Sequence, residues 1–273
     1  MIQHRKPAVA GLFYPANPQK LESDINRYLN YSIPSFIPSK IFGLISPHAG
    51  YIYSGSSAAY GFNTIKNKKF NTIIIISPSH REYFPGVSIY NGDAYETPLG
   101  SIPINQEISD LLVDNKGNIF RGINGHKEEH AIEVQLPFLQ CVLEDFSIVP
   151  IVMGDQSKIF VDALAERIND IVNDNTLLIA SSDLSHYYAS AEAEEKDSKT
   201  EKSINEFNID QLTSDFSQNK CEACGAGPIL SLMKSAILKN KNKSLVLNRT
   251  HSGYVSGDYD QVVGYLSAVF YGE

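Results

Sequence analysis

Residues 72–80 read TIIIISPSH, a run of β-branched side chains that ends in a short polar loop carrying His80. A continuous apolar run of this length is typical of a strand buried on both faces, as in a parallel or mixed sheet covered by helices. The run therefore predicts a central strand over residues 72–77. It also places the loop with His80 at the carboxyl end of that strand.

Apolar runs of the same kind recur along the chain. They predict further strands over residues 41–46, 146–152, 176–181 and 262–270. Within the second of these, Pro150 favours an edge or irregular strand, because proline cannot donate a ladder hydrogen bond. Helical periodicity predicts helices over residues 18–29, 56–65, 161–172 and 228–238. The alternation of strands and helices indicates an α/β sandwich.

The composition is that of an ordinary globular protein. The chain has 273 residues, of which 20% are charged and 42% hydrophobic. No linker divides it, so residues 1–273 are expected to form a single domain. The net charge of −8 argues against a nucleic-acid partner, because nucleic-acid-binding surfaces are normally basic.

Cysteine content and hydropathy bear on the environment of the protein. Three cysteines are too few for the disulfide framework of a small secreted protein, which favours a cytoplasmic location. No N-terminal targeting segment is recognisable. The apolar run over residues 262–271 is interrupted by Gly264 and Ser267, and it is shorter than the about 20 residues that a spanning helix needs. No membrane partner is expected.

Three of the seven histidines follow predicted strands. His48 comes after residues 41–46, His80 after residues 72–77, and His186 after residues 176–181. In open α/β sheets ligands bind beyond the carboxyl ends of the strands. A single histidine there is usually a hydrogen-bonded structural residue, but three at equivalent positions predict a functional site.

Imidazoles from separate strand ends are typical of a catalytic metal centre rather than a structural one. Cys224 lies just before the helix predicted at residues 228–238, where the helix N-terminus is expected to lower the pKa of the thiol and favour a metal-binding thiolate. Cys221 and Cys224 also form a C-x-x-C motif, which can be without function. A redox-active motif is the other possibility, but such a motif should follow a strand, and residues 215–220 are a poor strand. Cys141 is expected to be a buried small hydrophobe.

A polar cluster over residues 128–138 offers further candidates. If this segment is helical, His130 and Glu133 lie three residues apart on one face, where they can support metal ligands or relay protons. An equally good interpretation is a solvated first helical turn whose acids face the helix dipole. Both interpretations stay open.

Several ordered motifs span almost the whole chain. They are RKPAVAGLFYP at residues 5–15, PHAGY at 47–51, SPSH at 77–80, EH at 129–130 with LP at 136–137, SSDLSH at 181–186, CGAGPI at 224–229, SGDY at 256–259 and VGY at 263–265. In these motifs the sequence resembles the Memo-like proteins, named for a mediator of cell motility. The resemblance implies a three-layer α/β/α sandwich with a central mixed, largely parallel sheet, related to the class III extradiol dioxygenases.

The resemblance also implies a set of functional residues. Class III extradiol dioxygenases bind non-haem iron through two histidines and a glutamate and use another histidine in acid–base chemistry, whereas the Memo-like pattern has a cysteine in place of the glutamate. Carried over to this chain, the metal ligands are His48, His80 and Cys224. The acid–base residue is His186, with Asp183 beside it.

The cysteine affects which metal is expected. A thiolate softens the site and shifts its preference from iron toward copper(I) or zinc, although iron is not excluded. The Memo-like family is linked with copper or iron and redox chemistry, and in animals with phosphopeptide binding and cell motility. Prokaryotic relatives are often encoded near radical-SAM proteins, which implies a pathway link.

Three functions follow as hypotheses. The first is a metal-dependent oxidoreductase whose substrate the sequence does not name. The second is a non-catalytic module that binds a peptide or a small aromatic or anionic ligand in the same pocket, beside Tyr51, Tyr53 and Tyr187. The third is hydrolysis by a metal-activated water or a Cys224–His186 pair, which ranks last because no nucleophile-elbow motif surrounds the cysteine.

Overall fold

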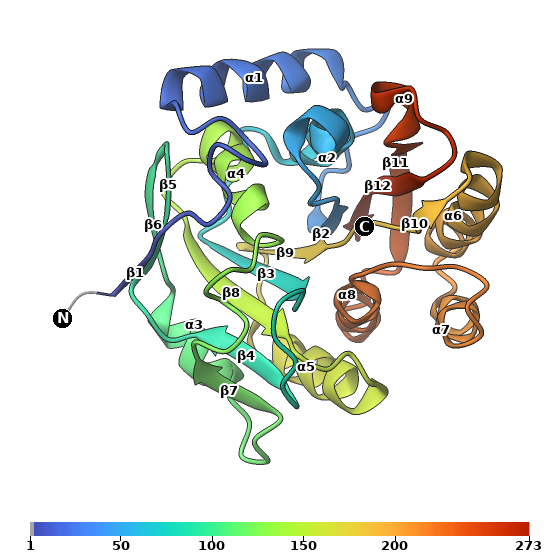
Figure 1. Cartoon of the computed structure of the whole chain (residues 1–273). Helices are drawn as coiled ribbons and strands as arrows, with labels where there is room; N and C mark the ends of the chain where they lie inside the picture. The colour runs from blue at the N-terminus through green and yellow to red at the C-terminus, as the bar shows by residue number, and fades with distance from the viewer. Residues whose placement is uncertain (1–2, 273) are drawn as a thin grey trace.

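A mixed sheet of nine strands runs through the middle of the protein, within residues 3–272, which are the residues that the computed structural model describes (Figure 1). In order across the sheet the strands are β10 (His186–Tyr188), β12 (Val262–Tyr271), β2 (Ile41–Ser46), β9 (Thr176–Ser181), β3 (Thr72–Pro78), β8 (Ser147–Met153), β4 (Val87–Tyr90) and β7 (Ile119–Gly122), and β11 (Lys243–His251) pairs with β12. The central strands β2, β9, β3 and β8 are parallel, and β12 and β4 pair antiparallel with this group. The expected mixed sheet is confirmed.

Helices cover both faces of the sheet, which makes the protein an α/β sandwich, as expected (Figure 1). One face packs against α1 (Pro18–Tyr31), α2 (Tyr51–Ile65) and α4 (Leu136–Val142), the last preceded by the 3-10 turn η1 (Glu133–Gln135). The other face packs against α3 (Gln106–Leu112), α5 (Lys158–Ile171), α6 (Ser190–Asn205), α7 (Ile209–Ser217) and α8 (Ala226–Leu238). A short helix, α9 (Gly253–Ser256), connects β11 and β12.

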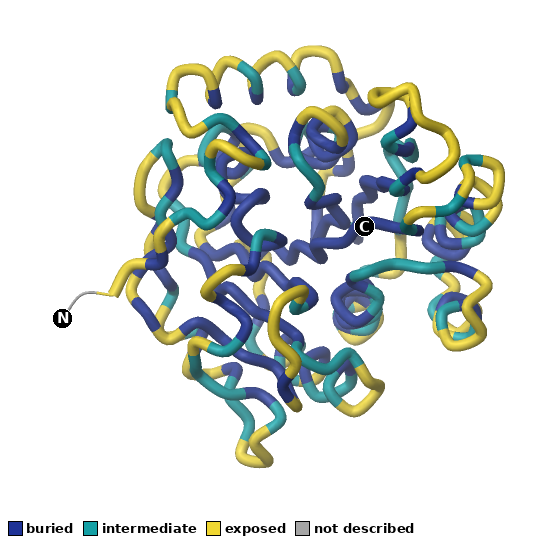
Figure 2. The backbone as a smooth tube through the Cα atoms, viewed as in Figure 1, coloured by how far each residue is buried: buried dark blue, intermediate teal, exposed yellow. Residues whose placement is uncertain are grey.

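Strand β3 shows why its sequence is apolar at every position. Ile73 and Ile75 belong to the core beneath α1, α2 and α4, whereas Ile74 and Ile76 belong to the core beneath α5 and α8. All four side chains are fully buried, because alternate residues of a strand point to opposite faces and both faces are covered. The buried strands lie in the interior of the backbone trace in Figure 2.

A small second sheet attaches the N-terminal segment. It consists of β1 (His4–Arg5), β5 (Ala94–Thr97) and β6 (Gly100–Pro103). The buried guanidinium of Arg5 forms an ion pair with the fully buried carboxylate of Glu133. This carboxylate also accepts hydrogen bonds from the Tyr14 hydroxyl (2.5 Å) and from the amides of Ala8 (2.7 Å) and Val9 (3.0 Å). Glu133 therefore fixes the 5–15 motif to the body of the fold.

The structure corrects some boundaries and one strand position. The helix expected at residues 56–65 begins at Tyr51, directly after the first strand-end loop. Pro150 predicted an edge or irregular strand, and the edge alternative is wrong because β8 lies between β3 and β4. The ladder between β4 and β8 ends at Ile151. Pro150, which has no amide hydrogen to donate, therefore lies just beyond the paired residues.

Among residues 3–272, none of the helices combines the length and apolar character needed to cross a bilayer.

Candidate metal centre

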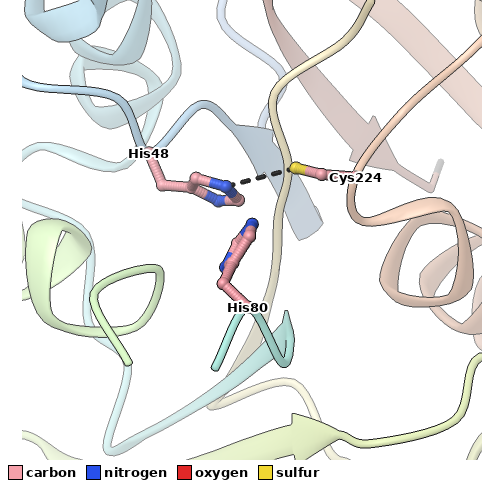
Figure 3. Close-up of side chains that lie close together, drawn as sticks. All are labelled: His48, His80 and Cys224. Carbon is pink, nitrogen blue, oxygen red and sulfur yellow. Dashed lines mark hydrogen bonds between the residues drawn. The ribbon is translucent and has the colours of Figure 1, made fainter. Parts of the chain in front are cut away.

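Three residues from separate loops come together beyond the carboxyl ends of the central strands. His48 follows β2, His80 follows β3, and Cys224 precedes α8. One donor atom from each lies within 4.8 Å of the donor atoms of the other two, and the side chains point toward one another (Figure 3). The His48 Nε2 atom is 3.2 Å from Cys224 Sγ. The fold thus assembles the three residues that the sequence suggested as ligands.

Hydrogen bonding fixes which nitrogen of His48 faces this point. The Ser181 hydroxyl donates its only proton to the Ala131 carbonyl (2.7 Å), so it can only accept from its other partners. His48 Nδ1, at 2.9 Å from the same oxygen, must therefore carry a proton. Gln135 Nε2 also donates to the Ser181 hydroxyl oxygen (2.8 Å). His48 Nε2 is consequently left unprotonated and free to act as a metal ligand.

Burial keeps His48 in this neutral form. The residue is only 2% exposed. Its burial and the neighbouring His80 lower the pKa of His48 to about 3, because both disfavour a positive charge there. Near neutral pH the ring is therefore already in the state that coordinates metal ions.

A buried carboxylate orients His80. Glu129 accepts hydrogen bonds from His80 Nδ1 (2.9 Å) and from the His80 amide (2.7 Å), and the Ala131 amide donates to it as well (2.9 Å). Burial opposes ionisation of Glu129, but its hydrogen bonds and electrostatic interaction with His80 outweigh it and lower the pKa of Glu129 to about 2. In the neutral ring the carboxylate holds the proton on Nδ1, so Nε2 of His80 is the nitrogen with the lone pair.

Cys224 lies in a half-buried loop before α8. The Asp183 amide donates to its sulfur (3.2 Å), and the Cys224 amide donates to the Asp183 carbonyl (3.2 Å). Burial and the nearby Asp183 carboxylate raise the pKa of the Cys224 thiol, so the expected lowering by the helix N-terminus is wrong for the metal-free protein. The helix dipole acts over one turn and is worth about 1 kcal/mol, which is less than the cost of ionising a buried thiol.

Asp183 connects two of the three candidate ligands. Its carboxylate accepts from the His48 amide (2.8 Å), and its backbone holds Cys224 as described above. Burial raises the pKa of the Asp183 carboxyl, whereas the His48 amide bond and nearby imidazoles oppose this shift. Asp183, expected as a catalytic residue, is therefore placed to position the two candidate ligands His48 and Cys224.

His186 lies at the start of β10, on the rim of the same loops. Its Nδ1 donates to the Leu184 carbonyl (2.7 Å), which can only accept. Its Nε2 is therefore unprotonated in the neutral ring and can accept a proton from a bound molecule. The side chain is 26% exposed, which leaves it accessible from solvent.

The structure separates His130 from Glu133. His130 lies in a turn before η1 rather than in a helix, and its ring is 4.6 Å from that of His80 and 5.2 Å from that of His48. Burial and His48 lower the pKa of His130 to about 4. Glu133 instead binds Arg5 and Tyr14, and His130 is not helical, so the helical pairing that was one of the two open interpretations is not found. His80, Glu129 and His130 also form a second group with metal-ligating spacing.

Cys221, Cys141 and Tyr51 pack in the interior and do not contribute to the candidate metal centre. Cys221 is buried in the core beneath α5 and α8, and Cys141 is half-buried and packs against the opposite core. Tyr51 is buried and its hydroxyl donates to the Val134 carbonyl (2.7 Å), so it does not line an open pocket. Tyr53 and Tyr187 are exposed.

Glu129, Ser181 and Gln135 were not identified from the sequence as functional residues. Their roles depend on contacts with His48 and His80, and between Gln135 and Ser181, across 46 to 133 residues of sequence. Glu129 and Ser181 do stand inside the EH and SSDLSH motifs, which was the only available signal.

Comparison with known proteins agrees with this architecture. The family model described as Memo-like protein matches residues 5–269. MEMO1 family proteins of Thermoplasma volcanium and Thermoplasma acidophilum are 40% and 37% identical to the chain, with 97% of the chain aligned in each case and 97% and 98% of the relative. A MEMO1 family protein of Methanosarcina mazei is 35% identical, covering 98% of this chain and 99% of its own. The chain therefore belongs to the Memo-like protein family.

Proposed function

We propose that this protein binds a redox-active transition-metal ion, copper or iron, through His48 Nε2, His80 Nε2 and Cys224 Sγ, and uses it in redox chemistry on a small molecule. The observation that carries the proposal is the convergence of three donor atoms within 4.8 Å. Hydrogen bonds to Ser181 and Glu129 leave each imidazole with its lone pair on Nε2. Two imidazoles and one sulfur are a chemically sound donor set for such an ion.

The donor set favours a soft metal. A thiolate and two neutral imidazoles suit copper(I) or zinc better than iron(II), which prefers a carboxylate as third ligand. Because the Cys224 thiol is protonated in the metal-free protein, metal binding must release a proton from sulfur. Metal affinity is therefore expected to rise with pH.

Three protein ligands leave coordination positions for a substrate, as in catalytic metal sites generally. When bound, a copper or iron ion supplies one-electron chemistry at this position. His186 Nε2 accepts a proton from the bound molecule, since Nδ1 is already committed to the Leu184 carbonyl. Asp183 keeps His48 and Cys224 in position through its carboxylate and backbone.

The metal proposal is tested by anaerobic purification and measurement of bound copper, iron and zinc. Wild type is expected to hold about one metal ion per chain, and His48→Ala and Cys224→Ala to lose most of it. Cys221→Ala is the matched control, because it removes a buried thiol three residues away that is not part of the ligand group. Equal metal content in all four proteins contradicts the proposal.

The redox proposal needs a second measurement. The metal-loaded protein is expected to consume oxygen or an artificial electron acceptor in the presence of small phenolic or thiol reductants, and His186→Gln to slow this reaction without reducing metal content. Retained metal without any turnover would instead support a binding module. The exposed side chains of Tyr53 and Tyr187 favour that second function, and ligand-induced thermal stabilisation without oxygen consumption would identify it.

A further inference from the structure

A lysine-lined cavity lies at the opposite end of the sheet from the metal centre. It has a volume of about 310 Å³ and is bordered by residues at the amino ends of β2, β3 and β9. These are the strands whose carboxyl ends lead to His48, His80 and Asp183. Because a strand of six residues spans about 20 Å, the cavity and the metal centre are separate places on the protein.

Four lysines border this cavity, and they come from three segments that are distant in the chain. Lys40 precedes β2, Lys68 and Lys69 lie between α2 and β3, and Lys241 lies between α8 and β11. Asp174 is the one carboxylate among the described residues that lines it. Within residues 3–272 these ammonium groups form no ion pair, and Lys68 donates only to the Ser39 carbonyl (3.1 Å).

Helix dipoles explain part of this lysine content. The C-termini of α2, α5 and α8 lie next to lining residues of the cavity, and each carries roughly half a negative charge. Together with Asp174, they offset roughly two and a half of the four lysine charges. Lys68 and Lys69 are shared with a neighbouring hollow that is lined by Glu144 and Asp145, whereas Lys40 and Lys241 are not. The positive charge specific to this cavity is therefore that of Lys40 and Lys241.

The rest of the lining suits a small ligand. Ser39, Asn173 and Thr176 contribute hydroxyl and amide groups, and the buried rings of Phe42 and Phe70 contribute apolar surface. Lysine ammonium groups bind phosphate as point charges with three donors each. A cavity of this size accommodates a small molecule rather than a polymer.

We propose that this cavity binds a small diphosphate-bearing anion. A diphosphate concentrates its charge in a smaller volume than a polycarboxylate does, which matches several lysines around one compact space. Inorganic pyrophosphate and a nucleoside diphosphate share this chemistry. The two differ in whether a base and ribose contact the apolar surface of Phe42 and Phe70.

The test is calorimetric titration of the intact protein with sodium pyrophosphate and, separately, with ADP at low ionic strength. Saturable binding of one anion per chain is expected, and Lys40→Gln/Lys241→Gln is expected to weaken it at least tenfold. These two lysines are chosen because Lys68 and Lys69 also border a neighbouring hollow that contains Glu144 and Asp145. Equal affinity for both ligands assigns the site to the diphosphate alone, and tighter ADP binding assigns it to a nucleotide.

A charge-matched double variant provides the control. Lys116→Gln/Lys202→Gln removes two exposed lysines elsewhere and is expected to leave the affinity within twofold of wild type. Amide resonances of Phe42, Phe70 and Thr176 are expected to shift on titration with pyrophosphate. The proposal is overturned if wild type shows no saturable binding, if both double variants weaken binding equally, or if equimolar sulfate at matched ionic strength binds as well. The anion titration does not depend on bound metal, so failure of the metal proposal leaves the diphosphate proposal intact.

Discussion

The Nδ1 atom of His48 donates a hydrogen bond of 2.9 Å to the hydroxyl of Ser181, because that hydroxyl has already given its proton to the Ala131 carbonyl. This one contact decides which imidazole nitrogen faces His80 and Cys224. Ser181, on the strand next to β2, thus fixes His48 in the tautomer that the proposed metal centre requires.

Replacing Ser181 with alanine is expected to weaken metal binding about 10- to 100-fold, because His48 loses the partner that fixes its tautomer. The variant also leaves the His48 Nδ1 proton unpaired and Gln135 with only the Pro47 carbonyl as acceptor, which is expected to cost about 1–3 kcal/mol of stability. Affinity is measured by competition with a chromophoric chelator. Ser57→Ala is the control, since it removes a buried hydroxyl that has no hydrogen-bond partner in the described chain. Similar losses of affinity in both variants would contradict the role of Ser181.

Replacing Glu129 with glutamine is expected to reduce metal affinity by about 10- to 100-fold, because the amide orients His80 less firmly than the carboxylate does. The neighbouring Glu128 is exposed, and Glu128→Gln is expected to leave affinity unchanged. The same chelator competition reports both variants. Unchanged affinity in Glu129→Gln would show that the carboxylate does not support His80.

The ion pair of Arg5 and Glu133 is expected to matter for stability rather than for metal binding. Glu133→Gln leaves the buried Arg5 guanidinium without its counter-charge and is expected to cost about 3–5 kcal/mol. Glu96→Gln breaks the surface pairs with Lys6 and His4, which solvent screens, and is expected to cost much less. Urea unfolding followed by circular dichroism measures both. Equal midpoints for the two variants would rule out the proposed anchoring of the N-terminal segment.

Asp197 on α6 is expected to make stability depend on pH. Burial raises its pKa to about 6, although the Ser185 amide and Arg249 oppose this shift, and Glu222 adds to it. Because the folded protein holds this proton to a higher pH than the unfolded chain, the stability contribution is present below about pH 4. It is lost as the pH rises through about 6, by a total of about 3 kcal/mol.

This prediction is checked by chemical unfolding between pH 4 and pH 7. Asp197→Asn is expected to lose this part of the pH dependence, because its side chain does not titrate. Glu192→Gln, an exposed change on the same helix, is expected to keep the wild-type profile. The assignment to Asp197 fails if the asparagine variant follows the wild-type curve.

Local pattern alone was enough for five strands, β2, β3, β8, β9 and β12, and for the loops that carry the histidines, but it did not predict β4, β7, β10 and β11 of the same sheet. The TIIII run predicts β3 because four consecutive buried β-branched residues require cover on both faces, and its end places His80 at the sheet edge. The same reasoning places His48 after β2. Pro150 shows the limit of such prediction. The sequence shows that Pro150 lacks an amide hydrogen, but it does not show that the β4–β8 ladder stops before this residue.

The pKa of the Cys224 thiol could not be predicted from the sequence. The position of Cys224 before α8 suggested a lowered thiol pKa, yet burial and the Asp183 carboxylate raise it. Desolvation depends on every segment that packs around the sulfur, and several of these lie more than forty residues away. A helix boundary, by contrast, can be seen in a few consecutive residues.

The sequence by itself determined the α/β class, the strand ends that carry His48, His80 and His186, and the resemblance to the Memo-like family. These features depend on short-range periodicity and on residue order. Cys224 was also named from the family resemblance, but only the tertiary structure brings its sulfur within 4.8 Å of the donor atoms of the two imidazoles. The tertiary structure alone decided that Ser181 and Glu129 hold the Nδ1 protons of the two histidines, and that four lysines border one cavity at the far end of the sheet. Hydrogen bonds and desolvation act between atoms a few ångströms apart, and only folding brings such distant parts of the chain together.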